Sequence, residues 1–558
     1  MGIPSYFSHI VKKHRAIIKK YNSKAIKIDN LYLDCNSIIY DCLHNIPYKN
    51  KVDFESTLLN NICSKIENYI NIIKPTNRVF VAFDGVAPVA KLSQQKNRRY
   101  KSWFQNMINQ DIYKTHDIKK WNSAAITPGT DFMKLLNSTI RTHFVNSNKF
   151  NIAHIIVSGS DECGEGEHKI YDYIRKNSEY HEDTTTVIYG LDADLIMLTL
   201  NHLKYCNNMF LFRETPHFIS QIDRTLIPND NYMLDIPEFA DKLVYEMTHT
   251  SENSKAVISE ETRESIIQDY IFMCFLLGND FMPHFPSLNI RTNGINHLIN
   301  AYNAINDNDT NTNTNTNTLI PKNNLTKGNN IVWKNVRKLF DILAKSEHTN
   351  LIEEYKIKEK IERRTRTVNS PEDEEDKFIS IPTYERDIEK YINPREDYWE
   401  YRYYSALFNI EINDPDAAED KLRLRQISVN YLETLEWTFK YYTEGCVNWR
   451  HYYKYNYPPL LKDLCKFVPH FNANFIANNS GNSINEYVQL CYVLPRDSLN
   501  LLPNKLCKIL LEDYPEYYRL DYKFQWAFCR YFWECHVLMP HINLSTLEKI
   551  VDKYITGK

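Results

Sequence analysis

Three short apolar runs in this chain each end on an aspartate. These aspartates are Asp34, Asp84 and Asp192. Runs of β-branched and aromatic residues this short predict buried parallel strands rather than helices. Ligands of an open α/β sheet bind outside the carboxyl ends of its strands. We therefore expect the three acids to meet in one crevice, where their mutual repulsion requires a bound cation.

The composition limits the class of protein. The 558 residues are enough for two to four average domains, or for one large catalytic core with additions. A net charge of −3 provides no global basic field, so a local cluster would have to hold any polyanion. The 12 cysteines include no CxxC pair, which argues against a zinc knuckle and fits a reducing compartment. We find no signal peptide and no run of the ~18 apolar residues that a membrane span needs, and expect a cytoplasmic protein with no membrane partner.

The order of predicted elements divides the chain into three parts. Residues 1–300 alternate strand-like and helix-like segments, which predicts an α/β fold with a central, mostly parallel sheet and the metal site. Residues 301–383 read as an insertion or linker with a polar Asn/Thr repeat, which we expect to be disordered. Residues 384–558 are rich in apolar and aromatic residues and are expected to be largely helical.

Four further acids accompany those at the strand ends. Glu165 and Glu167 lie in the segment GEGEH, Asp194 follows Asp192 by two residues, and Asp280 ends the segment FLLGND. Carboxylates two residues apart in an extended segment point to the same side. Ligand sets made only of oxygen favour Mg²⁺ or Mn²⁺ over zinc, and two such ions ~3.5–4 Å apart can activate water for phosphoryl displacement. A single acid at a strand end is more often a solvated cap, but this many in one chain favour a metal site.

A basic stripe follows Asp84. Lys91, Gln95, Arg98 and Arg99 have the spacing i, i+4, i+7 and i+8, which puts them on one face of a helix. Guanidinium groups bind phosphate oxygens in a bidentate fashion. A solvated helix face is the alternative interpretation. The position of the stripe, just past a candidate metal ligand, favours a phosphate pocket.

Together these segments resemble the Xrn family of 5′→3′ exoribonucleases. The resemblance is carried in the first half by MGIPSYF, LDCNSIIY, FDGVAPVAKLSQQKNRRY, TPGTDFM, SGSDECGEGEHKI, YGLDADLIML and FLLGNDFMPHFPSL, and in the second half by YWEYRYYSALF, LEWTFKYYTEGCVNWRHYYKYNYPP, VLPRDSLNLLP and FWECHVLMPHI. The segments of the first half follow the order they have in the family. The resemblance spans most of the chain, except the Asn/Thr repeat and a charged stretch near residues 353–376.

The resemblance implies a PIN-like catalytic core related to the flap nucleases, with residues 384–558 packed on it to complete one catalytic domain. It implies a compact member without the accessory C-terminal domains of the large members. The 5′-monophosphate pocket of the family falls on the basic stripe, Lys91, Gln95, Arg98 and Arg99. The family's metal-binding acids are all present in this chain: Asp34, Asp84, Glu165, Glu167, Asp192, Asp194 and Asp280.

Two positions depart from the family pattern. Tyr40 stands where the family usually has a histidine that stacks on the 5′ base; its aromatic face should preserve stacking. Trp449 matches the partner stacking residue, with Trp437 as the alternative, whereas a second expected tryptophan is His451.

The function implied by the resemblance is hydrolysis of single-stranded RNA from its 5′ end. The substrate would be decapped, 5′-monophosphorylated RNA, because a closed phosphate pocket would exclude a cap or a triphosphate. The products would be nucleoside 5′-monophosphates, and the cofactor two Mg²⁺ or Mn²⁺ ions. Two alternatives share the fold, a structure-specific DNA nuclease of the flap type and a non-catalytic RNA-binding protein. The sequence identifies no protein partner.

Overall fold

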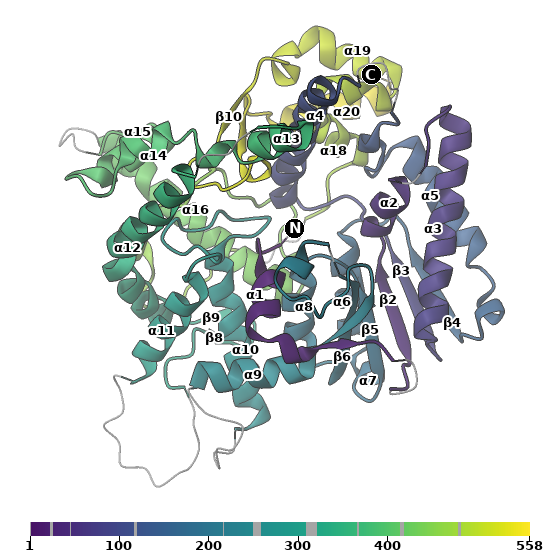
Figure 1. The fold of residues 1–558 in the computed structure, drawn as a ribbon, viewed down its shortest axis with the longest axis horizontal. Coiled ribbons are helices and arrows are strands. Elements are labelled where there is room, and N and C mark those ends of the chain that lie inside the picture. The colour runs from purple at the N-terminus through teal and green to yellow at the C-terminus, as the bar shows by residue number, and fades with distance from the viewer. Residues whose placement is uncertain are drawn as a thin grey trace.

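The alternating strands and helices of the first half build one seven-stranded sheet (Figure 1). Neighbouring strands are parallel in the order β6-β5-β2-β3-β4, and the antiparallel strands β7 and β1 extend the sheet beyond β6. The predicted α/β fold with a mostly parallel central sheet is therefore confirmed. The strands are β1 (Ile18–Lys20), β2 (Asn30–Asp34), β3 (Arg78–Ala82), β4 (His154–Ser158), β5 (Thr185–Tyr189), β6 (Asn208–Glu214) and β7 (Asn231–Asp235).

The computed structural model describes most of residues 2–557. The residues outside the description are 1, 23–25, 45, 116–119, 216, 249–257, 308–320, 365–367, 413–417, 478–480 and 558. Most of the predicted Asn/Thr repeat lies among these residues, so the structure says nothing about it. The three-part division of the chain stays a prediction.

Both faces of the sheet are buried, as the continuous apolar runs predict. Because side chains alternate along a strand, Leu31 and Leu33 of β2 face one apolar core and Tyr32 faces the other. The first core is closed by α2 (Asn36–Leu43), α3 (Lys51–Ile73) and α5 (Asp131–His143). The second core is closed by α1 (Tyr6–Lys13), α6 (Gly166–Lys176), α8 (Asp194–His202), α9 (Ile236–Thr248) and α10 (Glu260–Cys274).

Helix α4 (Val89–Tyr113) carries the predicted basic stripe and leaves the sheet at its carboxyl edge. It starts seven residues after β3 and is flanked by C-terminal elements, as Figure 1 shows. The backbone N–H of Val89 donates to the carbonyl of Trp449 at 3.0 Å, which ties the first turn of α4 to the second half of the chain. The orientation of the stripe therefore depends on both halves of the molecule.

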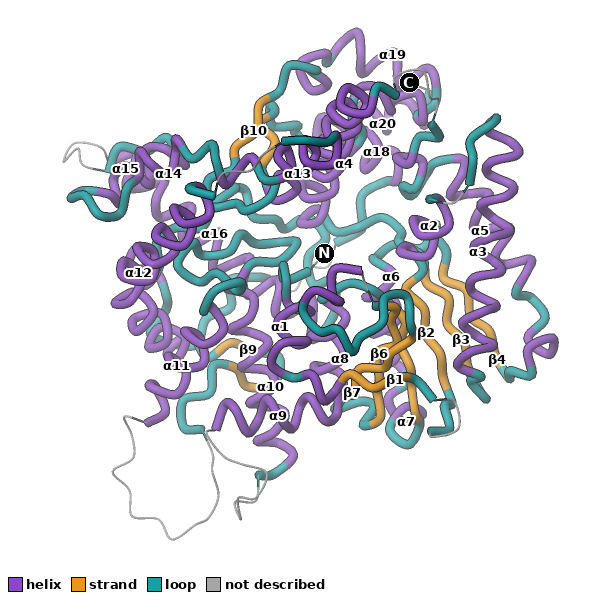
Figure 2. Tube along the Cα trace, in the orientation of Figure 1, coloured by secondary structure: helices purple, strands orange, loops and turns teal. Residues whose placement is uncertain are grey.

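The second half is largely helical, as predicted, and Figure 2 shows helices making up most of the molecule outside the sheet. Helices α16, α8 and α10 share one apolar core, so the two halves are packed together. Part of the segment predicted as an insertion is helical and buried, since Leu351 and Tyr355 of α12 lie in a core. The remaining elements are α7 (Ser178–His181), α11 (Gly294–Asp307), β8 (Thr326–Lys327), β9 (Asn330–Ile331), α12 (Trp333–Glu362), α13 (Pro371–Ile379), α14 (Asp387–Ile392), α15 (Trp399–Phe408), α16 (Ala418–Thr443), α17 (Leu461–Leu464), α18 (Glu486–Val493), α19 (Asn504–Asp513), β10 (Lys523–Gln525), β11 (His536–Leu538) and α20 (Leu544–Thr556).

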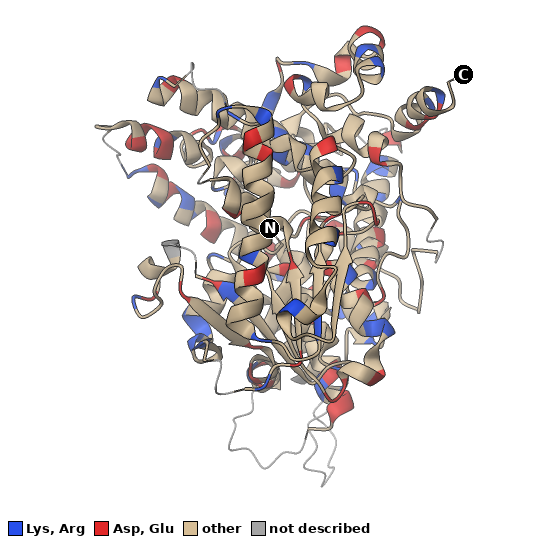
Figure 3. Ribbon diagram, turned by 90° about the vertical axis from the view of Figure 1, so that its right-hand side faces the viewer, with Lys and Arg blue, Asp and Glu red and all other residues tan. Residues whose placement is uncertain are grey.

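Charged side chains are interspersed over the molecule. Figure 3 shows basic and acidic residues mixed on the face it presents, which agrees with the small net charge. None of the helices that the structure describes is both long enough and apolar enough to cross a membrane.

Candidate active site

The three predicted strand-end acids come together at the carboxyl edge of the sheet. Asp34 is the last residue of β2, Asp84 lies two residues past β3, and Asp192 lies three residues past β5. Burial raises the pKa of Asp34 well above its usual value, and the nearby charges of Asp84 and Asp192 raise it further. Asp34 Oδ1 and Asp84 Oδ1 lie within 3.5 Å of the position that a Cβ atom at Gly166 would occupy, which places these two acids in one crevice.

The first turn of α6 adds two more acids to this crevice. Glu165 immediately precedes the helix and Glu167 lies in its first turn, where the helix dipole favours negative charge. The backbone N–H of Gly166 donates to Asp84 Oδ1 at 2.7 Å. A Cβ atom at Gly166 would lie 2.7 Å from Asp34 Oδ1, so only glycine allows this close approach.

Asp194 and Asp280 complete the cluster. Burial and the charge of Asp280 raise the pKa of Asp194 to about 7. Lys91 Nζ lies 2.5 Å from Asp280 Oδ2 and 2.6 Å from Glu165 Oε2. Burial would raise the pKa of Asp280, but the ammonium of Lys91 and other nearby positive charges, among them Arg98, together hold that pKa below the usual range. Lys91, the first residue of the basic stripe, thus lies among the acids and pairs with two of them.

The donor set fits a metal ion. Asp34 Oδ1 and Asp194 Oδ1 are buried and have no hydrogen-bond partner among the described residues. Ligand atoms of Glu165, Glu167 and His168 lie within 4.8 Å of one another. Unpaired buried carboxylate oxygens are costly unless a cation or a proton satisfies them. This acidic cluster could therefore bind a metal ion.

Helix α16 contributes two tyrosines that the sequence analysis missed. The hydroxyl of Tyr441 donates to Glu165 Oε1 at 2.9 Å. Its ring stacks on His168 at a centroid distance of 3.7 Å, and Tyr442 meets the same imidazole edge-on at 5.8 Å. No local spacing pattern identifies these residues, because 276 positions separate Tyr441 from Glu165. His168 was also missed, although it lies in the GEGEH segment.

The basic stripe divides into two environments. Arg99 donates to Thr127 Oγ1 at 2.7 Å and to the carbonyl of Gln95 at 3.1 Å, so its guanidinium is held in place. Gln95 is buried, and its Oε1 has no hydrogen-bond partner among the described residues. Arg98 is exposed and makes no hydrogen bond to any residue that the structure describes. Lys91 forms ion pairs with the acids, whereas Arg98 interacts with Asp280 and Asp192 only through its charge within the described part of the chain.

The predicted stacking residues differ in accessibility. Tyr40 on α2 is partly buried and interacts electrostatically with Arg98 and Arg99. Trp449 is half-buried, in the turn whose carbonyl accepts from the start of α4. Trp437, the alternative, is 0% exposed, stacks on Tyr441 at 4.8 Å and donates its indole N–H to a backbone carbonyl. Trp437 is a core residue and offers no face to a base.

His451 occupies the position of the expected second tryptophan. Its Nε2 lies 2.9 Å from Thr434 Oγ1, and burial lowers its pKa to about 4. It is therefore a neutral, buried imidazole beside α16.

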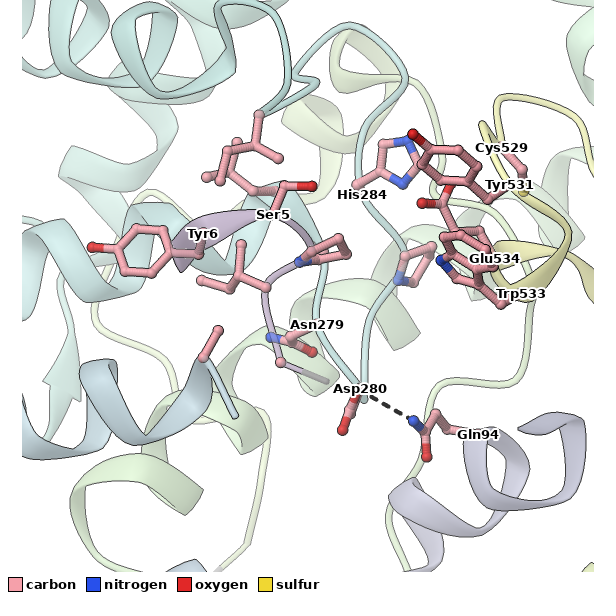
Figure 4. Close-up of a pocket in the computed structure, with 18 of the residues that line it drawn as sticks. Ser5, Tyr6, Gln94, Asn279, Asp280, His284, Cys529, Tyr531, Trp533 and Glu534 are labelled. Atoms are coloured by element: carbon pink, nitrogen blue, oxygen red, sulfur yellow. Dashed lines mark hydrogen bonds between the residues drawn. The ribbon is translucent and has the colours of Figure 1, made fainter. Parts of the chain in front are cut away.

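A cavity of about 1170 Å³ adjoins the acidic cluster (Figure 4). Asp192, Asp280 and Arg98 all line it, together with the loop between β10 and β11. Lys91, Gln95 and Arg99 are not among the residues that line this cavity, so it is not the phosphate pocket expected from the basic stripe, which stays a prediction.

A mostly parallel sheet, helices on both faces and acids at the carboxyl edge define an α/β protein with a PIN-like core. The family model described as "XRN 5'-3' exonuclease N-terminus" matches residues 1–215, and the model described as "Xrn1 helical domain" matches residues 261–387 and 306–555. The chain belongs to the Xrn family.

Curated relatives match nearly the whole chain. The human protein named 5'-3' exoribonuclease 1 is 29% identical over 99% of this chain and 34% of its own length. The Saccharomyces cerevisiae protein of that name is 25% identical over 100% of this chain and 43% of its own. The Drosophila melanogaster 5'-3' exoribonuclease 2 homolog is 25% identical over 100% and 72%. The chain thus spans less than half the length of the first two relatives.

Proposed function

We propose that this chain is a 5′→3′ exoribonuclease that removes nucleoside 5′-monophosphates from single-stranded RNA. The observation that carries the proposal is that the acidic cluster lies beside an exposed arginine, Arg98, on one side of α4. An acidic cluster suits phosphodiester hydrolysis, and an arginine suits a terminal phosphate. Xrn-family membership and the names of the relatives support the same activity.

The acidic cluster would hold the metal. Oxygen ligands favour Mg²⁺ or Mn²⁺, and a pair of these ions would supply an activated water and charge stabilisation when bound. The residues that would hold them are Asp34, Asp84, Glu165, Glu167, Asp192, Asp194 and Asp280. Tyr441 would orient Glu165 through its hydrogen bond, which fixes the position of one carboxylate oxygen.

The basic stripe would bind the 5′-phosphate. Arg98 is the accessible donor, whereas Arg99 is fixed by Thr127 and presents a preoriented charge beside it. Gln95 lies in the same region, and its side-chain amide would contribute a donor through Nε2. Lys91 lies between the acids and the rest of the stripe. Its positive charge would offset the negative charges of Glu165 and Asp280 on one side and of the bound phosphate on the other.

Tyr40 and Trp449 would contact the first bases. Both are incompletely buried aromatic rings, and both are close to α4 through contacts already described. Stacking on a ring tolerates every base, which suits stepwise removal of nucleotides without sequence preference.

A comparison of RNA ends tests the proposal. Wild-type protein and Asp192→Ala are incubated with Mg²⁺ and RNA that carries a 5′-monophosphate, a 5′-hydroxyl or a cap, and with a 5′-flap DNA. We expect mononucleotide release from the monophosphate RNA by the wild type only. Equal rates on all three RNA ends would contradict the assignment of the phosphate pocket. Full activity of Asp192→Ala would contradict the assignment of the metal site. Preferential cleavage of the flap DNA would favour the DNA nuclease instead.

A further inference from the structure

The cavity beside the acidic cluster reaches from Arg98 to the loop between β10 and β11. Asp192 and Asp280 line it near the acids, and Tyr531 and Trp533 line it at the loop. Figure 4 shows the loop residues on one wall and the N-terminal residue Ser5 on the opposite wall. Its volume of about 1170 Å³ is slightly above the range of about 300–1,000 Å³ that is usual for small-molecule sites. The cavity therefore has room for more than a phosphate group.

Two aromatic rings form a platform on this wall. The rings of Tyr531 and Trp533 stack with centroids 4.4 Å apart and planes inclined by 19°. Trp533 is nevertheless 40% exposed, so the partner ring does not cover all of its surface. A tryptophan ring that is exposed inside a cavity is a suitable surface for a planar ligand.

The loop that carries this platform is held from both ends. Lys101 on α4 donates to the carbonyls of Trp533 and Cys535, the second at 2.9 Å. Glu534 pairs with Arg291 and accepts from the backbone N–H of Arg530 at 2.8 Å. A platform fixed before binding loses little entropy when a ligand arrives.

The cationic side chains that line the cavity differ in how far the protein already engages them. Lys101 is buried, with 9% of its surface exposed, and its ammonium already donates hydrogen bonds to two backbone carbonyls. Arg291 is paired with Glu534. Arg98, in contrast, is exposed and has no hydrogen-bond partner within the described part of the chain. An accessible guanidinium and an exposed ring face in one cavity match a phosphate linked to a planar base.

We propose that this cavity holds a nucleoside 5′-monophosphate, with its phosphate at Arg98 and its base on Trp533. The inference rests on the proposed exonuclease activity, whose product has this chemistry. The site shares Arg98 with the proposed site for the 5′-phosphate of the RNA but has a different base platform, because Tyr40 and Trp449 do not line the cavity.

Direct binding to the full chain tests this site without any turnover. Dissociation constants for AMP, CMP and ribose 5-phosphate are measured by calorimetry in Mg²⁺ buffer. We expect the nucleotides to bind roughly 5- to 100-fold tighter than ribose 5-phosphate, the difference that one stacked base provides. Trp533→Leu should abolish this preference and Trp533→Phe should keep most of it.

Two further variants separate the contributions. Arg98→Met should weaken the nucleotides and ribose 5-phosphate by the same factor, leaving their ratio unchanged. Trp103→Phe is the matched control, because Trp103 lies on α4 but does not line the cavity, and it should bind as the wild type does.

Three results would overturn the inference: an unchanged preference in Trp533→Leu, an equal loss in Trp103→Phe, or no nucleotide preference in a wild-type protein that degrades RNA. The last of these leaves the exonuclease proposal intact. Conversely, a base preference that depends on Trp533 in a protein that does not hydrolyse RNA supports the binding site and contradicts the exonuclease proposal.

Discussion

The two ends of the basic stripe on α4 differ in what surrounds their cations. Lys91 is 12% exposed and lies between the carboxylates of Glu165 and Asp280. Arg98, two turns further along, faces the cavity without a hydrogen-bond partner among the described residues. The first charge is balanced within the protein, whereas the second is left for a ligand. The same helical stripe thus contains one basic side chain that pairs with the acids of the protein, Lys91, and one that is accessible to a ligand, Arg98.

The acids around Lys91 should show the largest effect. Asp192→Asn removes a candidate metal ligand but keeps the size of the side chain, and metal assistance contributes several kcal/mol to a barrier. We expect kcat on 5′-monophosphate RNA to fall by roughly 10³-fold. Asp161→Asn is the matched control, because Asp161 is an exposed acid paired with Arg141. Retention of more than a tenth of the activity by Asp192→Asn would contradict the assignment.

Removal of the buried cation should mainly affect stability. Lys91→Met removes the ammonium that pairs with the buried carboxylates of Glu165 and Asp280, and breaking a buried ion pair costs about 3–5 kcal/mol. In EDTA we expect a loss of about 3 kcal/mol in the free energy of unfolding, measured by urea denaturation. Added Mg²⁺ should restore more stability to this variant than to the wild type. Equal stability of the two proteins in EDTA would show that Lys91 does not balance the acids.

Removal of the accessible cation should instead affect substrate choice. Hydrogen bonds to charged groups are worth about 1.5–3 kcal/mol. Arg98→Met should therefore lower kcat/KM on 5′-monophosphate RNA by roughly 10- to 100-fold and leave 5′-hydroxyl RNA nearly unaffected. Arg141→Met, which removes an arginine from an exposed ion pair, should leave both rates unchanged. A uniform loss on both RNA ends would show that Arg98 does not recognise the phosphate.

The smallest effect concerns pH. Burial and Asp280 raise the pKa of Asp194 to about 7, and a carboxylate must be ionised to bind a metal. The apparent affinity for Mg²⁺ should therefore rise roughly tenfold between pH 6 and pH 8, or about 1.4 kcal/mol. Thermal unfolding with Mg²⁺ and with EDTA measures this difference.

The stability of the metal-free protein, measured in EDTA, should change with pH in the opposite direction. Because the folded protein holds the Asp194 proton more tightly than the unfolded chain does, the contribution of this group to stability is complete below pH ~4. It is lost as the pH rises through about 7. Metal-induced stabilisation that is equal at pH 6 and pH 8 would contradict this linkage.

The strand-end acids could be predicted because their signals are local. Asp34, Asp84 and Asp192 each follow an apolar run, and parallel strands bring their carboxyl ends to one edge. The antiparallel strands β1 and β7 were not foreseen, since β1 has three residues and two of them are exposed. Strand direction at a sheet edge depends on connections that leave no periodic pattern.

Contacts between distant elements could not be predicted from residue patterns. Helical periodicity grouped Lys91 with Arg98, but the loop that brings Asp280 to Lys91 decides which cation is paired. Tyr441 and Trp437 look alike in the sequence, both aromatic residues of α16. Packing gives the first a hydrogen bond to Glu165 and places the second entirely in the core.

The hydrogen bond from Tyr441 to Glu165 has a consequence for biosynthesis. A ribosome makes all the candidate metal ligands, the last of which is Asp280, long before it makes α16. Until α16 docks, the nascent chain has an open acidic crevice without its tyrosine wall. Completion of the candidate centre therefore has to wait until α16 has been synthesised and packed.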